Sequence, residues 1–440
     1  MTRKTLLGML LVAVILMLCG CNMTTVDQLY CLPDRSEEHD NLQSLMSSAM
    51  EGLSYSAPVS GQNRQTVQMA DLNGDGEDEY ILFAKGTSEN PLYIFIFVRD
   101  GEEYRLLDTI QSSGSAFDQV EYVPMDNRKG CELVIGHQVS DQVLRSVSVY
   151  TMRDDRMELL MSSGYSKFLC TDLSRNGKNE LLLLRPGEED GQHGIAELYS
   201  LLSGTAERYT EAVMSRPVDK IKRIMVGRLD DGIPAVYVAS DVDGSAIITD
   251  VYAVVEGQFV NVSVSTESGT SVQTLRNYYV YADDIDNDGV LELPSLVTNH
   301  QGSADSAGTN HHVIRWYALQ SNGRTVNKEY TYHNFAGGWY LELNDAIAEG
   351  MTVQQLGNTY EFYLWDAEGK KSEKIMSVVV LTGQKREEQA LMDNRFVVYR
   401  GEATIYAAKL EVASAAYGID RDILIRNFHL ITQDWNTGET

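Results

Sequence analysis

The sequence predicts a mainly β protein: a five-bladed β-propeller of four-stranded repeats, followed by a small α+β domain. Three observations support this fold class. An acidic loop containing glycine recurs five times, at intervals of about 50 residues. Apolar runs flank each copy, and a later run alternates apolar and polar residues before a tight turn. Four short antiparallel strands in a repeat of roughly 50 residues are typical of a propeller blade.

The acidic loops share one template. It has an oxygen-bearing side chain at positions 1, 3 and 5, glycine at position 6 and glutamate at position 9. Three copies follow it, namely 71–79 (DLNGDGEDE), 172–180 (DLSRNGKNE) and 284–292 (DIDNDGVLE). Two further copies depart from it. VPMDNRKGCELVIG has a shorter loop but keeps Glu132, and VGRLDDGIPAVYVA has Ala235 where the glutamate belongs. Position 9 therefore recurs at residues 79, 132, 180, 235 and 292.

A second marker runs in phase with the loops. A tyrosine lies five residues before a turn residue in four of the repeats, at Tyr150, Tyr199, Tyr252 and Tyr317. The surrounding segments alternate in polarity, which is the spacing of a β-strand. We therefore assign 37–335 to the propeller, with a sixth blade available from flanking segments. The polar stretch 298–310 is read as an insertion in the last repeat.

The loop template suits a calcium ion. Calcium prefers six to eight oxygen ligands, and glycine at position 6 permits the bend that brings the position 7 carbonyl round. A glutamate at position 9, with a strand after it, distinguishes these loops from an EF-hand, whose glutamate is at position 12. The alternative is that Asp, Asn and Gly gather at turns for conformational reasons alone. The predicted ligands are Asp71, Asn73, Asp75, Glu77 and Glu79; Asp172, Ser174, Asn176 and Glu180; and Asp284, Asp286, Asp288, Val290 and Glu292.

The three loops resemble those of FG-GAP or VCBS-type repeats, which are also present in integrin α-chain propellers. The resemblance covers roughly 65–335 and is strongest for 71–79 and 284–292. It implies calcium with a structural role. The loop at 172–180 has a weaker ligand set, because Ser174 and Asn176 are neutral and Lys178 lies beside them.

The N-terminus predicts export. Arg3 and Lys4 precede an uncharged apolar run at 6–18, which is shorter than the roughly 20 residues of a membrane-spanning helix and suits a secretory signal. The run ends in Leu18-Cys19-Gly20-Cys21, which resembles a bacterial lipobox. The resemblance implies cleavage after residue 20 and a lipid on Cys21, with 21–36 as a tether. The start of the mature chain is also similar to uncharacterised lipoproteins of clostridial-type bacteria.

The last part of the chain has a different pattern. All four tryptophans lie in 316–435, and the acidic repeat stops. Strand-like runs such as TYEFYLW and KIMSVVVLTG are followed by DRDILIRNFHLI, which has helical spacing. We assign 336–440 to a small α+β domain.

The composition restricts the function. The net charge of -27 disfavours nucleic-acid binding, since such a surface repels phosphate backbones. No H-E-x-x-H, G-x-S-x-G, P-loop or G-x-G-x-x-G motif is present. The sequence favours a non-enzymatic, lipid-anchored, calcium-binding interaction or scaffold protein on the outer face of the membrane, with an unidentified protein or polysaccharide ligand. The alternatives are a polysaccharide-active, lyase-like enzyme and an envelope assembly factor.

Overall fold

The computed structural model describes residues 37–139, 145–187, 193–278, 280–297, 311–335, 337–365 and 372–431. The predicted signal peptide, the tether with Cys21 and the insertion at 298–310 lie outside the described residues. The described chain is mainly β and forms six antiparallel sheets, each of four or five strands. The mainly β prediction is therefore confirmed.

The first four sheets are antiparallel meanders whose strands follow one another along the chain, as the repeat predicts. In each of them, the acidic loop connects the first two strands of the meander. The first sheet contains β2 (Val67–Ala70), β3 (Glu79–Lys85), β4 (Leu92–Asp100) and β5 (Glu103–Ser112), with β1 (Ser54–Tyr55) also paired to β3. The second contains β6 (Ala116–Val123), β7 (Glu132–Gln138), β8 (Arg145–Arg153) and β9 (Arg156–Tyr165). The third contains β10 (Lys167–Thr171), β11 (Glu180–Pro186), β12 (Gly194–Ser200) and β13 (Glu207–Val213). The fourth contains β14 (Ile221–Arg228), β15 (Pro234–Val242), β16 (Ala246–Val255) and β17 (Gln258–Asn261).

The fifth sheet differs from the prediction at both edges. It contains β18 (Leu293–Leu296), β19 (His311–Leu319), β20 (Thr325–Asn334), β21 (Trp339–Leu343) and β27 (Phe428–Leu430). In the described residues directly before the acidic loop, no strand of this sheet precedes β18, and a single bridge joins Asp283 and Glu292 instead. At the other edge, β21 buries alternate side chains and pairs with β20. The strand β21 therefore belongs to the fifth sheet although it lies after the boundary predicted at 335–336, and the domain bounds stay a prediction.

The sixth sheet and the helices complete the fold. The sheet has the order β22 (Met351–Leu356), β23 (Thr359–Trp365), β24 (Ser372–Thr382), β26 (Thr404–Leu410) and β25 (Phe396–Arg400). The α-helices are α3 (Glu37–Ala49), α4 (Asp345–Ala348), α5 (Arg386–Gln389) and α6 (Arg421–Arg426), and the 3-10 turns are η1 (Val218–Lys220), η2 (Val272–Thr274), η3 (Met392–Asn394) and η4 (Val412–Tyr417). The helix expected to include Phe428 ends earlier, because the chain leaves it to pair with β21.

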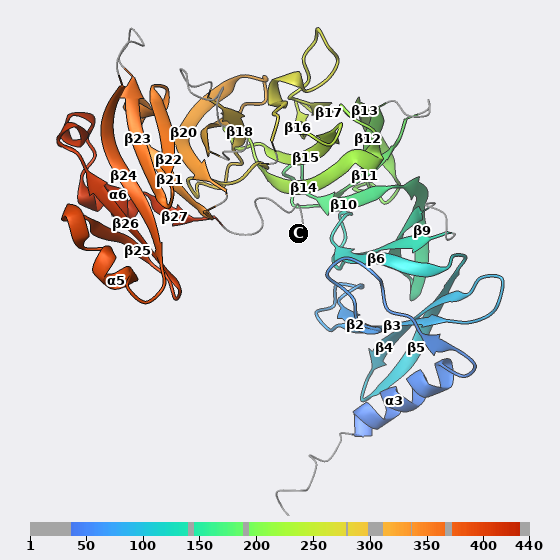
Figure 1. The fold of residues 1–440 in the computed structure, drawn as a ribbon. Coiled ribbons are helices and arrows are strands. Elements are labelled where there is room, and N and C mark those ends of the chain that lie inside the picture. Colours follow the sequence, from blue (N-terminus) through green and yellow to red (C-terminus); the bar gives the residue numbers. More distant parts are fainter. Residues whose placement is uncertain are drawn as a thin grey trace, which may run out of the picture.

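Apolar clusters lie between consecutive sheets. Phe83 and Phe117, for example, meet edge to face at 5.1 Å between the first and second sheets. Similar clusters follow between each later pair of sheets, up to the sixth. Helix α3 covers the outer face of the first sheet, and Ala390 at the end of α5 packs on the sixth. Figure 1 shows the sheets following an arc, with the first and sixth at its ends. The predicted closed propeller is therefore not confirmed in the described residues.

The acidic loops of neighbouring sheets are joined by backbone hydrogen bonds. The N–H of Cys131 donates to the Asp71 carbonyl (3.0 Å), that of Asn179 to the Pro124 carbonyl (2.8 Å) and that of Leu291 to the Arg228 carbonyl (3.1 Å). Each donor residue directly precedes the glutamate at position 9 of its loop, which we call the closing glutamate. Between the third and fourth sheets the equivalent residue is Pro234, which has no N–H to donate.

Candidate metal centre

Four of the five acidic loops share an internal contact that the sequence analysis did not identify. The carboxylate at position 9 is buried and accepts a hydrogen bond from the backbone N–H of position 2. The pairs are Leu72 with Glu79 (2.7 Å), Met125 with Glu132 (2.6 Å), Leu173 with Glu180 (2.8 Å) and Ile285 with Glu292 (3.1 Å). Where Ala235 replaces the glutamate, the Leu229 N–H donates to the Ile233 carbonyl instead (2.8 Å). The glutamate therefore holds the loop together as well as offering an oxygen.

The second oxygen of that carboxylate distinguishes the loops. In Glu79 this oxygen accepts a hydrogen bond from the Asn73 amide (2.7 Å). In Glu180 it accepts from the Ser174 hydroxyl, and in Glu132 from the Thr151 hydroxyl (3.1 Å). At Glu292 the position 3 residue is Asp286, a carboxylate in the place where the loops 71–79 and 172–180 have an amide or hydroxyl donor. The Oε1 atom of Glu292 is buried and has no hydrogen-bond partner. The Oε1 of Glu292 thus lacks the side-chain donor that the corresponding carboxylate has in the other three loops, and either a bound cation or the proton that burial favours would fill its place.

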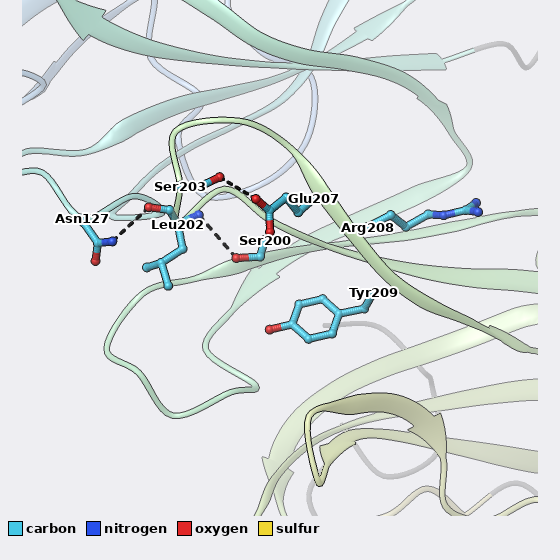
Figure 2. Close-up of a pocket in the computed structure, with 7 residues that line it drawn as sticks. All are labelled: Asn127, Ser200, Leu202, Ser203, Glu207, Arg208 and Tyr209. Atoms are coloured by element: carbon cyan, nitrogen blue, oxygen red, sulfur yellow. Dashed lines mark hydrogen bonds between the residues drawn. The ribbon is translucent and has the colours of Figure 1, made fainter.

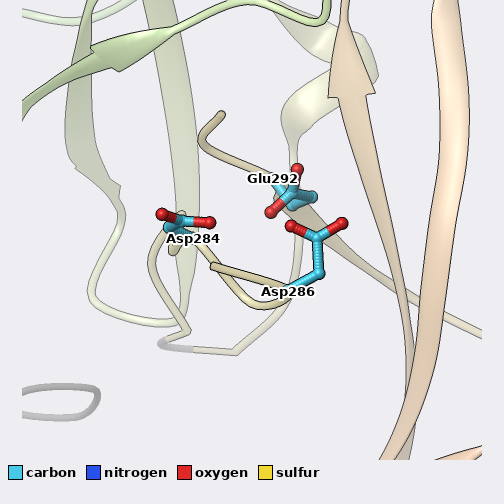
Figure 3. Close-up of side chains that lie close together, drawn as sticks. All are labelled: Asp284, Asp286 and Glu292. Atoms are coloured by element: carbon cyan, nitrogen blue, oxygen red, sulfur yellow. The ribbon is translucent and has the colours of Figure 1, made fainter. Parts of the chain in front are cut away.

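Three carboxylates converge in the loop 284–292. One oxygen from each of Asp284, Asp286 and Glu292 lies within 4.8 Å of the other two (Figure 3), so this cluster could bind a metal ion. The Oδ1 atom of Asp284 is also buried without a partner, while its Oδ2 accepts from the Gly289 N–H (3.0 Å). Gly289 has a φ of 83°, the left-handed conformation that glycine adopts without strain. The loop geometry thus follows the sequence template.

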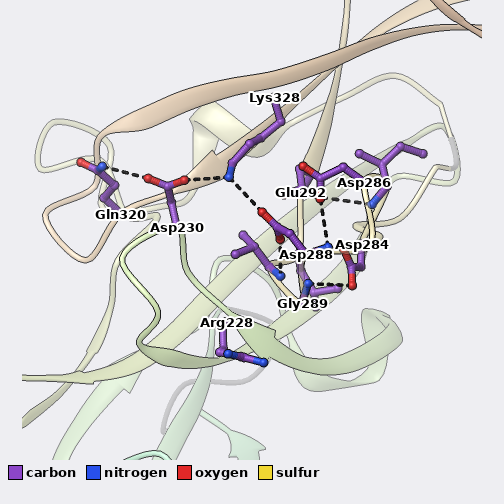
Figure 4. A network of polar contacts seen from close by, with 12 residues as sticks. Arg228, Asp230, Asp284, Asp286, Asp288, Gly289, Glu292, Gln320 and Lys328 are labelled. Atoms are coloured by element: carbon purple, nitrogen blue, oxygen red, sulfur yellow. Dashed lines mark hydrogen bonds and ion pairs between the residues drawn. The ribbon is translucent and has the colours of Figure 1, made fainter.

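The predicted ligand Asp288 does not join this cluster. Its Oδ2 forms an ion pair with the Lys328 ammonium (3.2 Å), and its Oδ1 accepts from the Val290 N–H (2.8 Å). Lys328 also binds the Oδ1 of Asp230 (2.9 Å), as Figure 4 shows. No sequence pattern predicts this pairing, because Lys328 lies 40 residues from Asp288 along the chain.

The loop 71–79 is held by its own hydrogen bonds. Asp71 accepts from the backbone N–H groups of Gly74 (2.6 Å) and Gly76 (3.0 Å). Asp75 accepts from the Glu77 N–H (2.8 Å) and from the Asn73 amide (2.9 Å). The Glu77 side chain lies 3.8 Å from Arg99, where it forms an exposed ion pair. The Asn73 amide therefore links Asp75 to Glu79, but in the described residues the carboxylates of this loop do not converge as those of 284–292 do.

The loop 172–180 has a similar internal network. Asp172 accepts from the backbone N–H groups of Asn176 (3.1 Å) and Gly177 (2.9 Å). The Asn176 side-chain oxygen accepts from the Lys178 N–H (2.8 Å). The hydroxyl of Ser174 takes the second oxygen of the closing carboxylate, as described above. This loop has a single carboxylate besides Glu180, so calcium here, as at 71–79, stays a prediction.

Burial makes the closing carboxyls weak acids. Desolvation is the main cause that raises the pKa of Glu292 to about 8; the charges of Asp286 and Asp288 act in the same direction, and the hydrogen bond from Ile285 opposes them. Desolvation also raises the pKa of Glu79 to about 7, although the hydrogen bond from Leu72 opposes the shift. A metal ion binds the ionised carboxylate, so it must displace the proton that Glu292 retains at neutral pH.

This shift predicts that chelator-treated protein becomes less stable as the pH rises from 6.5 to 8.5. The folded state holds the Glu292 proton up to about pH 8, whereas the unfolded chain releases it near 4.5. A group whose folded pKa is raised loses its stabilising contribution over that interval. We expect the melting temperature to fall less steeply in Glu292→Gln. Equal slopes for the two proteins would contradict the assignment.

A pocket of about 450 Å³ lies away from this centre (Figure 2). Arg208 and Tyr209 of β13 line it together with Asn127 from the second sheet. The Asn127 amide donates to the Leu202 carbonyl (3.1 Å), and Glu207 accepts from the Ser203 hydroxyl (2.9 Å). No residue of the acidic cluster lines this pocket.

Among the described residues, no helix is long and apolar enough to span a membrane.

Comparisons with known proteins give distant matches. No family model and no curated protein matches the sequence. Among solved structures, the chain is similar to a Bacillus licheniformis rhamnogalacturonan lyase PL11 (12% identity, 73% of this chain and 72% of that chain covered, TM-score 0.28). It is also similar to rhamnogalacturonan lyase YesW (12% identity, 88% and 80% covered, TM-score 0.32) and to Saccharomyces cerevisiae Sqt1 (8% identity, 79% and 99% covered, TM-score 0.29). At these scores the matches carry no argument about function.

Proposed function

We propose that this chain is a non-enzymatic, lipid-anchored scaffold or interaction protein outside the cytoplasm, and that it binds calcium in the loop 284–292. One observation carries the metal part of the proposal. The Glu292 carboxylate is fully buried, faces Asp284 and Asp286, and has an oxygen without a hydrogen-bond partner. A cation supplies the missing interaction, since a buried carboxylate with an unmatched oxygen is costly.

Calcium is the proposed ion because the donors are all oxygens. Carboxylate and carbonyl groups suit hard cations, and calcium tolerates irregular geometry better than magnesium does. The carbonyl of Val290 at position 7 is a further proposed ligand. The ion would hold a loop that is bonded to the fourth sheet through Leu291 and Arg228. Its proposed role is therefore to rigidify the contact between the fourth and fifth sheets. Closure of the repeats into a propeller stays a prediction from the sequence.

A cleft carrying paired carboxylates, or Lys, Arg and Tyr side chains converging near the ion, would favour the enzyme alternative. In the described part of the chain, the lysine that contacts the acidic loop is Lys328, and two carboxylates bind its ammonium group. Arg276, which is 4% exposed, donates to the carbonyls of Val280 and Thr274. These polar contacts of Lys328 and Arg276 support a structural role for both side chains, and we therefore propose a structural ion.

The lipid anchor predicts the behaviour of Cys21→Ala. Without the thiol there is no site for the lipid, so the precursor should accumulate with its signal peptide uncleaved by the lipoprotein signal peptidase. Metabolic labelling with a radioactive fatty acid, followed by cell fractionation, measures both effects. Ser47→Ala, an exposed position on α3, is a control that should leave processing unchanged. If Cys21→Ala is still cleaved after residue 20 and remains membrane-bound without label, the anchor proposal is wrong.

A further inference from the structure

Lys328 connects two acidic loops that belong to different sheets. It lies on β20 of the fifth sheet, and its ammonium contacts Asp288 of the loop 284–292 at 3.2 Å. The same group contacts Asp230 of the β14–β15 loop at 2.9 Å. The Lys328 side chain is 19% exposed, which is low for a lysine. Its contact with Asp288 places the ammonium charge next to the acidic loop 284–292.

The fourth loop, between β14 and β15, holds this lysine in place. It has Ala235 where the other four loops have a glutamate. Its Asp230 binds Lys328 with one oxygen, and its second oxygen accepts from the Gln320 amide (3.0 Å). Asp230 thus has hydrogen-bond partners on both oxygens and fixes the position of Lys328 (Figure 4).

The position 5 side chains in the other two loops have local partners. Asp75 accepts from Glu77 and Asn73, and Asn176 accepts from Lys178. These partners all lie within the same loop. Asp288 alone of the three is bound to a charge on another strand. Because position 5 of the template is a calcium ligand, this ion pair removes a negatively charged ligand from the site that otherwise most needs a cation.

We propose that Lys328 competes with the bound ion for Asp288 and thereby weakens the calcium affinity of the loop 284–292. This inference rests on the proposed calcium site and assigns the residue that sets its affinity. An arriving ion meets the positive charge of Lys328 and finds one carboxylate already paired. Asp288 is 39% exposed, so its side chain has room to turn toward the ion when the lysine is absent. The positive charge also acts on the site directly through Coulomb repulsion.

The experiment is calorimetric titration of calcium chloride into the full chain, purified in a mild detergent. Lys328→Met keeps the apolar stem of the side chain and removes its charge. We expect it to bind calcium about tenfold more tightly than the wild type, from one added charged ligand and the loss of a nearby like charge. Lys328→Arg retains the charge and is expected to stay within about twofold of the wild type.

Two further variants separate competition from other effects. Lys374→Met removes a lysine that is also ion-paired, to Glu361 of the sixth sheet, and should leave calcium affinity unchanged. Asp288→Asn added to Lys328→Met should remove most of the gain relative to Asp288→Asn alone, because Asp288 is the ligand that the substitution releases; only the smaller part due to direct charge repulsion should remain. Circular dichroism of each variant shows whether the sheets remain folded.

The outcomes distinguish this inference from the proposed calcium site. If the wild type binds no calcium, the proposed function fails together with this inference. If the wild type binds calcium but folded Lys328→Met binds it with equal or lower affinity, the competition is wrong and the site stands. A gain that persists undiminished in the double variant would also overturn the proposal, since it would reflect charge removal alone and not release of Asp288.

Discussion

Trp339→Ala is expected to destabilise the C-terminal part of the chain by about 3–5 kcal/mol, the usual range for deleting a buried aromatic side chain. The indole ring is fully buried between the fifth and sixth sheets. It packs on Tyr360 and Phe428, with ring centroids 5.4 Å apart in each case. Its removal opens a cavity in the cluster that joins these sheets.

The loss of stability should stay local, because in the described residues these apolar clusters each join two consecutive sheets. In such an array, each sheet is stabilised mainly by its contacts with its immediate neighbours. Scanning calorimetry should show an early transition for the fifth and sixth sheets, with the remainder melting close to the wild-type temperature. Trp365→Ala, at a partly exposed ring that donates to Thr352, should cost much less. A single transition shifted as a whole would contradict the serial arrangement.

Asp286→Asn is expected to abolish the calcium response of the loop 284–292 while stabilising the metal-free protein. An amide at position 3 can donate to Glu292, as Asn73 donates to Glu79. It also removes the repulsion between two adjacent carboxylates. For the wild type, calcium at ten times the Kd should add about 1.4 kcal/mol of stability. Near-millimolar calcium should suffice, and magnesium should act weakly.

Thermal melting of the full chain in chelator and in calcium measures both parts of this prediction. The matched control is Asp75→Asn in the loop 71–79, where an internal network already satisfies the closing glutamate. That variant should retain the response of the loop 284–292. If Asp286→Asn keeps the full calcium shift, or is less stable than the wild type in chelator, the role assigned to the carboxylate pair is wrong.

Much of the fold was predictable because the repeat is local. The acidic template fixes the turn between two strands, and alternation of polarity locates the strands that follow. Ring closure was not predictable in this way, since it depends on whether the two end sheets meet. Helix α3 covers the first sheet through Leu42, and its own pattern of Leu42, Leu45, Met46 and Ala49 was a signal for an apolar helix face that the repeat-based analysis left out.

The candidate site was predictable as a loop but not as a network. Spacing alone placed Asp284, Asp286 and Glu292 together, and the structure does the same. The sequence template assigned the loop 71–79 an equally good calcium site, because the template does not distinguish Asn from Asp at position 3. The pairing of Asp288 with Lys328 depends on strands that come together only in the folded chain.

The central claim is tested most directly by counting calcium ions bound per chain. Equilibrium dialysis of the full chain against near-millimolar calcium would compare the wild type with Glu292→Gln. The glutamine retains an oxygen that can accept from the Ile285 N–H, so the loop keeps its internal contact while the charged ligand is lost. We predict that the variant holds one calcium ion fewer than the wild type. Equal binding by the two proteins, or no bound calcium in the wild type, would contradict the assignment of this loop as a calcium site.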